Sequence, residues 1–143
     1  MKLDISGNQV NDEHIDTLVK RCNKISELNL RCTSITNFSI DNIVMHLNLS
    51  LEKLNVGCTN IEDHTALLPL GYIKTLKILQ CQDFKDSELD IKESEKIEIL
   101  QKKLPTIRIN KDNFSIASSN LHFFEYENGI WEIRAKQQQL FAD

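Results

Sequence analysis

The sequence predicts an α/β fold built from a short unit that recurs along the chain, and two observations support this prediction. The first is a repeated phrase: LNLRCTSI at 28–35 returns as LNVGCTNI at 54–61, with fainter copies LDISGNQV at 3–10 and LKILQCQD at 76–83. The second is the alternation of apolar and other residues within each phrase, which is typical of a strand with one buried face. Each phrase should therefore supply one strand to a shared sheet.

A unit of this length with leucines at alternate positions is of leucine-rich-repeat type. A strand this short cannot bury its apolar face alone, so neighbouring units must stack and form a continuous core. We expect a leucine-rich-repeat solenoid over residues 1–110, with a curved parallel sheet and helices on its convex side. Residues 111–143 should form a C-terminal capping and folded-back tail. The 143 residues of the chain suit one compact domain.

The first unit should begin with a strand over 3–6, after which Asn8 should satisfy backbone groups of the bend. A helix should follow, capped near Asn11 or Asp12. Helical spacing predicts its inward face, which consists of Ile15, Leu18, Val19 and Cys22. Because no earlier unit precedes this one in the sequence, its apolar side chains should lie at an uncovered edge that favours self-association.

The second unit repeats this order. Leu28 and Leu30 should lie in the strand, Thr33 in the bend, and a helix should start at about Ser39. Apolar residues at helical spacing should face inward and pack against the first helix; they are Ile40, Ile43, Val44 and Leu47.

The third unit should have a shorter outer segment than the first two. Its strand carries Leu54 and Val56, in the same alternation as before. Pro69 and Gly71 interrupt any long helix, so about one and a half helical turns are expected over 66–70.

The fourth unit departs from the pattern. Its strand is expected over 76–78, and Asp83 then occupies an apolar slot of the phrase. A one-residue slip or bulge should bring the neighbouring Phe84 into the core. A helix over 94–103 and a last short strand at 107–109 should follow, which makes five strands in all.

The tail holds most of the aromatic residues of the chain, and so large an apolar surface should be buried. Asn128 and Gly129 suit a tight turn, and strand-like residues follow them. We expect residues 130–136 to lie across the concave face of the sheet, with Trp131 as the anchor.

Composition limits the classes of function. A net charge of −4, with 41% hydrophobic and 27% charged residues, is that of an ordinary globular protein. No basic patch suggests nucleic acid as a partner, and no apolar run approaches the ~20 residues of a membrane span. The first residues lack the apolar core of a secretory signal peptide. We therefore expect an intracellular location, in the cytoplasm or the nucleus.

The four cysteines follow the repeat rather than a disulfide pattern. Cys32 and Cys58 hold the same slot in successive phrases, Cys81 holds the adjoining slot, and Cys22 ends a helix. We expect four reduced thiols that serve as small, mainly buried hydrophobic side chains.

No residue pattern points to catalysis, a metal site or a cofactor. The four histidines are scattered one per segment, and the sequence has no H-E-x-x-H, no C-x-x-C and no glycine-rich phosphate loop. We therefore expect no catalytic residue, no metal ligand, no cofactor and no enzyme activity.

The candidate site is instead the concave face, where the residues between the inward leucines should project. Those predicted to bind a protein partner are Asp4, Asn29, Arg31, Asn55, Lys77, Arg108 and Trp131, and Ser6, Gly57, Leu79 and Asn110 should project beside them. The cations among them favour an extended or acidic partner segment. Arg31 is the first residue to test, because arginine is enriched among interface hot spots. A face that is only solvated is the alternative.

The C-terminal sequence resembles that of F-box proteins with leucine-rich repeats. The resemblance rests on LPTIRIN at 104–110, NFSIA at 113–117 and IWEIRAKQQQL at 130–140, which occur in the order in which this family's cysteine-type repeats pass into a tail. It covers the repeats in general and the last forty residues more specifically. It implies that Trp131 and Ile133 belong to a tail that lies across the concave face.

The resemblance also implies a function. The chain would be the substrate-recognition half of an F-box subunit of a cullin-based ubiquitin ligase, active in cell-cycle control. Its partners would be a cyclin-kinase-subunit adaptor and a phosphorylated substrate. No F-box occurs in the sequence, so a second possibility stays open: a non-catalytic leucine-rich-repeat scaffold or regulatory protein unrelated to ubiquitin transfer.

Overall fold

The computed structural model describes residues 1–84, 92–114 and 116, together with the backbone of 121–125 and 131–135. Within this part of the chain, five strands form one parallel sheet in the order of the sequence. They are β1 (Lys2–Asp4), β2 (Glu27–Asn29), β3 (Lys53–Asn55), β4 (Ile78–Gln80) and β5 (Arg108–Ile109).

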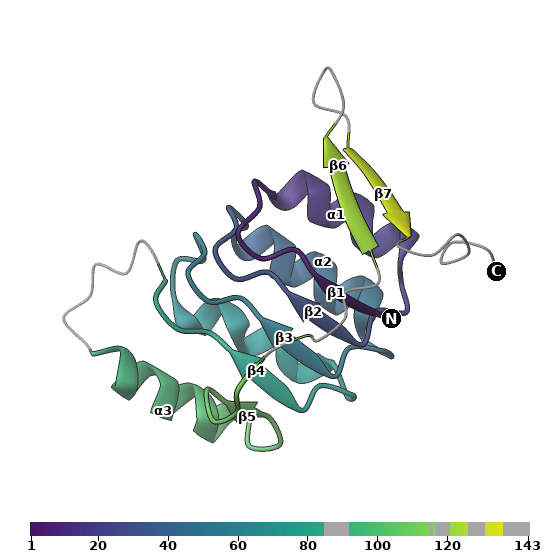
Figure 1. Ribbon diagram of the computed structural model, residues 1–143. Coiled ribbons are helices and arrows are strands. Elements are labelled where there is room, and N and C mark those ends of the chain that lie inside the picture. Colours follow the sequence, from purple (N-terminus) through teal and green to yellow (C-terminus); the bar gives the residue numbers. More distant parts are fainter. Residues whose placement is uncertain (85–91, 115, 117–120, 126–130, 136–143) are drawn as a thin grey trace.

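Helical segments join successive strands and pack on one side of the sheet (Figure 1). They are α1 (Asp12–Arg21), α2 (Asn37–Leu47), the 3-10 helix η1 (His64–Tyr72) and α3 (Glu93–Lys103). We call the opposite side of the sheet the helix-free face. The α/β class that the sequence predicts is confirmed, with a parallel sheet of five strands.

Four leucines in register mark the centre of the sheet. Leu3 pairs with Leu28, Leu28 with Leu54, and Leu54 with Leu79, and all four are fully buried between the sheet and the helices. The predicted alignment of the fourth phrase on Leu76 is therefore wrong, and β4 starts later than expected. Leu76 is buried in the turn before the strand, so both leucines fit an apolar pattern and the sequence alone does not separate them.

The first four strands end in a bend at which one residue has left-handed backbone geometry. These residues are Gly7, Cys32, Cys58 and Asp83, with φ values of 73°, 58°, 53° and 62°. Asp83 thus occupies the bend rather than an apolar slot, and Asp tolerates this conformation better than most residues. Phe84 is buried in the core, as predicted.

A polar side chain directly after the bend closes it in the first three units. In each case the side chain donates a hydrogen bond to the carbonyl oxygen three residues earlier: Asn8 to Ile5 at 3.0 Å, Thr33 to Leu30 at 2.6 Å and Thr59 to Val56 at 2.7 Å. The predicted role of Asn8 in the bend is confirmed. A side chain thus satisfies a backbone carbonyl at the bend in each of these three units.

The starts of the first two helices are fixed by side-chain caps. Asn11 caps α1, as predicted, because its Oδ1 accepts a hydrogen bond from the His14 backbone N–H at 3.2 Å. Thr36 caps α2, which begins two residues earlier than the sequence suggested. Asp12 joins the two helices, since its carboxylate accepts hydrogen bonds from the hydroxyls of Thr36 and Ser39, each at 2.6 Å.

The third and fourth outer segments differ in helix type. The segment expected over 66–70 is longer, and η1 holds Pro69 in its interior as a 3-10 helix. Proline has no N–H to donate and cannot continue a regular α-helix, which favours this geometry. In α3, Leu100 is buried and Ile97 is partly buried, and Leu104 beyond its end is also buried, as predicted.

The C-terminal part contains an antiparallel pair, β6 (Leu121–Glu125) and β7 (Trp131–Ala135). The backbone of β6 lies beside β1, whereas β5 forms the opposite edge of the parallel sheet (Figure 1). The chain therefore returns to its first strand after its fifth. The predicted turn at 128–129 and the side chain of Trp131 lie outside the described residues.

The prediction of an uncovered first unit is wrong. Its apolar residues have exposed fractions of 2% or less: Leu3, Ile5, Ile15, Leu18 and Val19. The reason is that α2 packs against α1 and β6 lies beside β1. The sequence pattern shows repeats only, so it does not reveal that a later segment comes back to this edge.

The cysteines are only partly as predicted. None of the four forms a disulfide, and Cys22 and Cys81 are buried. Cys32 is exposed and Cys58 is half-buried, which contradicts their expected role as buried hydrophobic side chains. Both occupy the left-handed bend position, where the side chain points away from the core.

Among the described residues, no helix combines the length and the apolar character that crossing a membrane requires.

Candidate functional site

The helix-free face carries three rows of side chains that run across the strands. The first is the charged row, which contains Lys2, Glu27 and Lys53 and continues through Ile78 to Arg108. The second is the middle row, formed by Asp4, Asn29, Asn55 and Gln80. The third is the bend row, formed by Ser6, Arg31, Gly57 and Gln82, one step further along each strand.

The middle row serves the backbone of the bends. In three successive units a side-chain oxygen accepts the backbone N–H two residues later: Asp4 from Ser6 at 3.0 Å, Asn29 from Arg31 at 3.0 Å and Asn55 from Gly57 at 2.9 Å. Asn29 and Asn55 are only 7% and 5% exposed. These three predicted partner-binding residues therefore lie where the sequence placed them, but they shape the face rather than project from it.

Glu27 supplies the carboxylate of the charged row, and its side chain is only 11% exposed. Its oxygens lie 3.1 Å from the Nζ atoms of both Lys2 and Lys53, on the two neighbouring strands. Burial opposes ionisation, but the hydrogen bonds and positive charges of the two lysines outweigh it and lower the pKa of Glu27. The row therefore ties β1, β2 and β3 together by charge.

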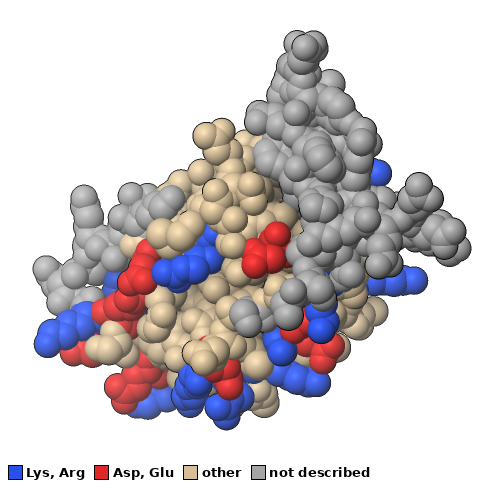
Figure 2. All heavy atoms as spheres, viewed as in Figure 1, with Lys and Arg blue, Asp and Glu red and all other residues tan. Residues whose placement is uncertain are grey.

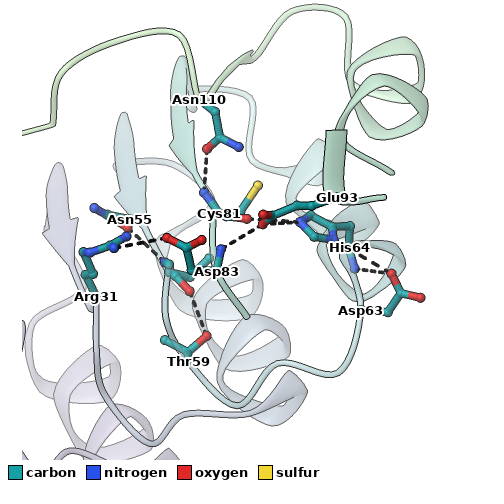
Figure 3. A network of polar contacts seen from close by, with 11 residues as sticks. Arg31, Asn55, Thr59, Asp63, His64, Cys81, Asp83, Glu93 and Asn110 are labelled. Carbon is teal, nitrogen blue, oxygen red and sulfur yellow. Dashed lines mark hydrogen bonds and ion pairs between the residues drawn. The ribbon is translucent and has the colours of Figure 1, made fainter. Parts of the chain in front are cut away.

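The side chain of Arg31, in the second unit, extends past the third unit to the fourth. Its Nη2 lies 3.4 Å from Oδ2 of Asp83, which stands in the bend after β4. The intervening residue of the bend row is Gly57, and a Cβ atom there would lie 2.6 Å from Arg31 Nη1. The absence of a side chain at 57 thus opens the path for the guanidinium (Figure 3).

The other predicted cations are also paired. Lys77 Nζ lies 3.1 Å from Glu52 Oε1, and Arg108 Nε lies 2.9 Å from Asp112 Oδ2. The hydrogen bond and charge of Asp112 raise the pKa of Arg108. Figure 2 shows this pattern over the helix-free face, where blue and red groups lie next to each other. The described part of the face is therefore charge-balanced rather than positive.

Not all predicted site residues lie in the rows. Lys77 is the residue before β4. The charged row passes through its neighbour Ile78, so Lys77 lies beside the row and not in it. Leu79 belongs to the core and does not project. Asn110 accepts a hydrogen bond from the Cys81 backbone N–H at 2.8 Å. The side chain of Trp131 lies outside the described residues, so its predicted role stays a prediction.

A buried polar cluster stands next to the bend row. In the fourth unit the position that holds Asn8, Thr33 or Thr59 elsewhere is Phe84, which cannot donate a hydrogen bond. The carbonyl oxygen of Cys81 is satisfied instead by His64, whose Nε2 lies 3.1 Å away. The Phe84 and His64 rings lie 4.7 Å apart between centroids. A histidine from the preceding unit thus replaces the missing bend side chain.

His64 is held in one tautomer by these contacts. A carbonyl oxygen can only accept, so Nε2 carries the proton and Nδ1 does not, and Nδ1 is buried without a hydrogen-bond partner. Burial is the main cause that lowers the pKa of His64, against the opposing charges of Glu93 and Asp63. Glu93 Oε1 lies 3.6 Å from Nε2 and accepts the Asp83 backbone N–H at 2.8 Å, which links α3 to the bend (Figure 3).

Several of these residues were missed in the sequence, namely Glu27, Gln80, Gln82, Asp83, His64 and Glu93. Glu27 could have been found, because it precedes a recognised leucine by one residue and so belongs to the face. Gln80 and Asp83 were hidden by the wrong alignment of the fourth phrase.

Among the described residues, no group of three or more His, Cys, Asp or Glu side chains is placed to hold a metal ion. The polar groups of the rows bond to one another and to the backbone. No protein-family model matches this chain, and no curated protein is significantly similar to it.

Proposed function

We propose that this chain is a protein-binding module that receives its partner on the helix-free face, and that its stacked units are leucine-rich repeats of a solenoid. The observation that carries the proposal is the register of the sheet, which sets three rows of polar and charged residues side by side across successive strands. Repeat folds use such faces for recognition, because each unit adds similar contacts at a fixed spacing.

The pairing of the cations decides what kind of partner fits best. Arg31 and Asp83 have side chains that are 39% and 66% exposed, so both charges are open to a partner. A segment with only acidic groups would have to displace Asp83, Glu52 and Asp112. A segment with alternating acidic and basic or amide groups would instead extend the existing rows. Of the extended or acidic partner segments that the sequence suggested, we therefore favour an extended segment of mixed polarity.

The finer assignment rests on the resemblance of the C-terminal sequence to F-box proteins with leucine-rich repeats, and most of all to the S-phase-kinase-associated F-box protein. Under it the chain acts as the substrate-recognition part of a cullin-based ubiquitin ligase, in the cytoplasm or nucleus. A cyclin-kinase-subunit adaptor and a phosphorylated substrate would be its partners. The alternative is a scaffold or regulatory protein of the same architecture without a role in ubiquitin transfer.

Affinity capture with the full chain tests the proposal. Wild type, Arg31→Met and the matched surface variant Lys24→Met serve as bait in cell extract, with quantitative mass spectrometry of the captured proteins. We expect at least one protein to be lost with Arg31→Met and retained with Lys24→Met. Purified cyclin-kinase-subunit adaptor is offered to the same baits in a separate binding assay.

The outcomes distinguish the F-box assignment from the scaffold alternative. Capture of the adaptor in an Arg31-dependent manner supports the F-box assignment. Arg31-dependent capture of other proteins without the adaptor supports the scaffold. Identical capture by all three baits contradicts a binding role of the helix-free face.

A further inference from the structure

A groove lies on the helix side of the molecule, between the end of η1 and the end of α3. It encloses about 470 Å³ and is lined by Leu68, Pro69, Gly71, Tyr72, Lys74, Lys103 and Leu104. The helix-free face contributes none of these residues, so nothing in the function proposed above uses the groove.

The floor of the groove is apolar and fixed. Leu104 is 6% exposed, and a Cβ atom on Gly71 would lie 2.9 Å from its Cδ2, so the two segments are in close contact. Gln101 anchors this end of α3, since its Nε2 donates to the carbonyl oxygens of Leu104 and Ile107 at 3.1 and 2.6 Å. A groove that is already ordered costs little entropy when a ligand enters.

The rim combines an exposed aromatic ring with positive charge. Tyr72 is 73% exposed, although most large apolar side chains of the described part are buried. Lys74 and Lys103 are exposed at the rim, and no carboxylate of the described residues lies within ion-pair distance of either. This differs from the helix-free face, where Arg31, Lys77 and Arg108 each have a carboxylate partner.

The position of Lys103 has a structural reason as well. It stands in the last turn of α3, where a positive charge complements the helix dipole. The charge is thus held at the rim by the fold.

From this combination we propose that the groove is a second docking site, which binds an acidic peptide segment of a partner protein by one apolar side chain. The apolar side chain lies on Leu68, Pro69 and Leu104 beside the Tyr72 ring. Flanking carboxylates of the peptide face Lys74 and Lys103. The charge complementarity of the rim selects an acidic segment over a neutral or basic one.

The test uses the full chain and labelled hexapeptides. The probe is Glu-Glu-Gly-Phe-Glu-Glu with a fluorescein group, and the comparison peptides replace every Glu by Gln or by Lys. Fluorescence anisotropy measures binding to wild type, Tyr72→Ala and Lys74→Glu/Lys103→Glu. The control variant is Lys24→Glu/Lys111→Glu, which reverses two exposed lysines elsewhere. Backbone amide shifts in ¹⁵N spectra locate the bound peptide.

We expect the acidic peptide to bind best and to shift the amides of Tyr72, Lys74 and Lys103. Reversal of both rim lysines should weaken binding about tenfold, the control should not, and added salt should weaken binding to the wild type. Equal binding of the Gln peptide, or no shift of these amides at millimolar peptide, overturns the proposal. So does a concentration-dependent dimer in sedimentation that Tyr72→Ala abolishes, because the occupant would then be a second copy.

Discussion

Arg31 and Asp83 form an ion pair, with 3.4 Å between Nη2 and Oδ2, although their units are separated by a whole unit of the sheet. The guanidinium crosses that unit at Gly57, the only position of the bend row that carries no side chain. The pair is partly exposed, so its own contribution to stability is small. Its importance lies in the shape and charge that it gives to the helix-free face.

Gly57→Ala should destabilise the fold by about 1–3 kcal/mol, as for other overpacked sites. The added Cβ would lie 2.6 Å from Arg31 Nη1, 3.0 Å from the Gln82 carbonyl oxygen and 3.2 Å from Asn55 Oδ1. The flexible arginine can move, so the cost should fall when Arg31→Ala is combined with it. Chemical denaturation of both single variants and the double variant measures this coupling. Strictly additive costs would contradict the contact between residues 31 and 57.

His64→Ala should leave the Cys81 carbonyl oxygen without a donor and cost about 1–3 kcal/mol. Phe84→Thr places a hydroxyl at the position where Thr33 and Thr59 bond the equivalent carbonyls, at the expense of Phe84 packing. We therefore expect the double variant to lose less than the sum of the two single losses, by about 1 kcal/mol. A double variant at or beyond the sum would show that His64 does not replace the bend side chain.

Stability should fall when the pH drops below the ordinary histidine value of 6.5. Burial lowers the pKa of His64 in the folded state, so between that lowered value and 6.5 the unfolded chain binds more protons than the folded one. The free energy of unfolding then rises with pH across this window and levels off above it, as far as His64 is concerned. Urea titrations of wild type and His64→Gln from pH 5 to 8 should show a steeper slope for wild type. Parallel curves would contradict the buried neutral histidine.

The four thiols should react in an order set by their burial. Cys32 is exposed and Cys58 is half-buried, so both should react with a coloured disulfide reagent in the native protein, Cys32 first. Cys22 and Cys81 should react only after unfolding, because burial raises the pKa of both thiols, that of Cys81 to about 12. Rapid labelling of all four without denaturant would contradict the burial of Cys22 after α1 and of Cys81 after β4.

The sequence predicts the first three strands and the first two helices well, because their leucines, bends and caps recur with little change. It fails at the fourth unit, where Phe84 replaces the polar bend residue and Leu76 competes with Leu79 for the same pattern. His64, in the unit before, supplies the hydrogen bond that Phe84 cannot donate. A contact between two units cannot be predicted from the local sequence pattern of either. The prediction that Cys32 is buried is wrong because its backbone is left-handed, which turns the side chain outward. A cysteine in the sequence does not indicate such a backbone.

The ion pairs of the face could not be predicted for a different reason. Glu52 precedes β3 and Lys77 precedes the neighbouring β4, so their contact follows only from the register of these two strands. With that register known, the pairs can be read from the sequence. The concave-face position of Trp131 stays a prediction.

Site-specific photo-crosslinking in cells tests the central claim, that the helix-free face receives a protein partner, most directly. A benzophenone amino acid replaces Gln82, which is exposed in the bend row, or Thr17, which is exposed on α1. The account predicts that illumination joins the chain with residue 82 replaced to at least one protein, which Arg31→Met then removes, and that the chain with residue 17 replaced gives no such product. Crosslinks of equal yield and identity from both positions would contradict it.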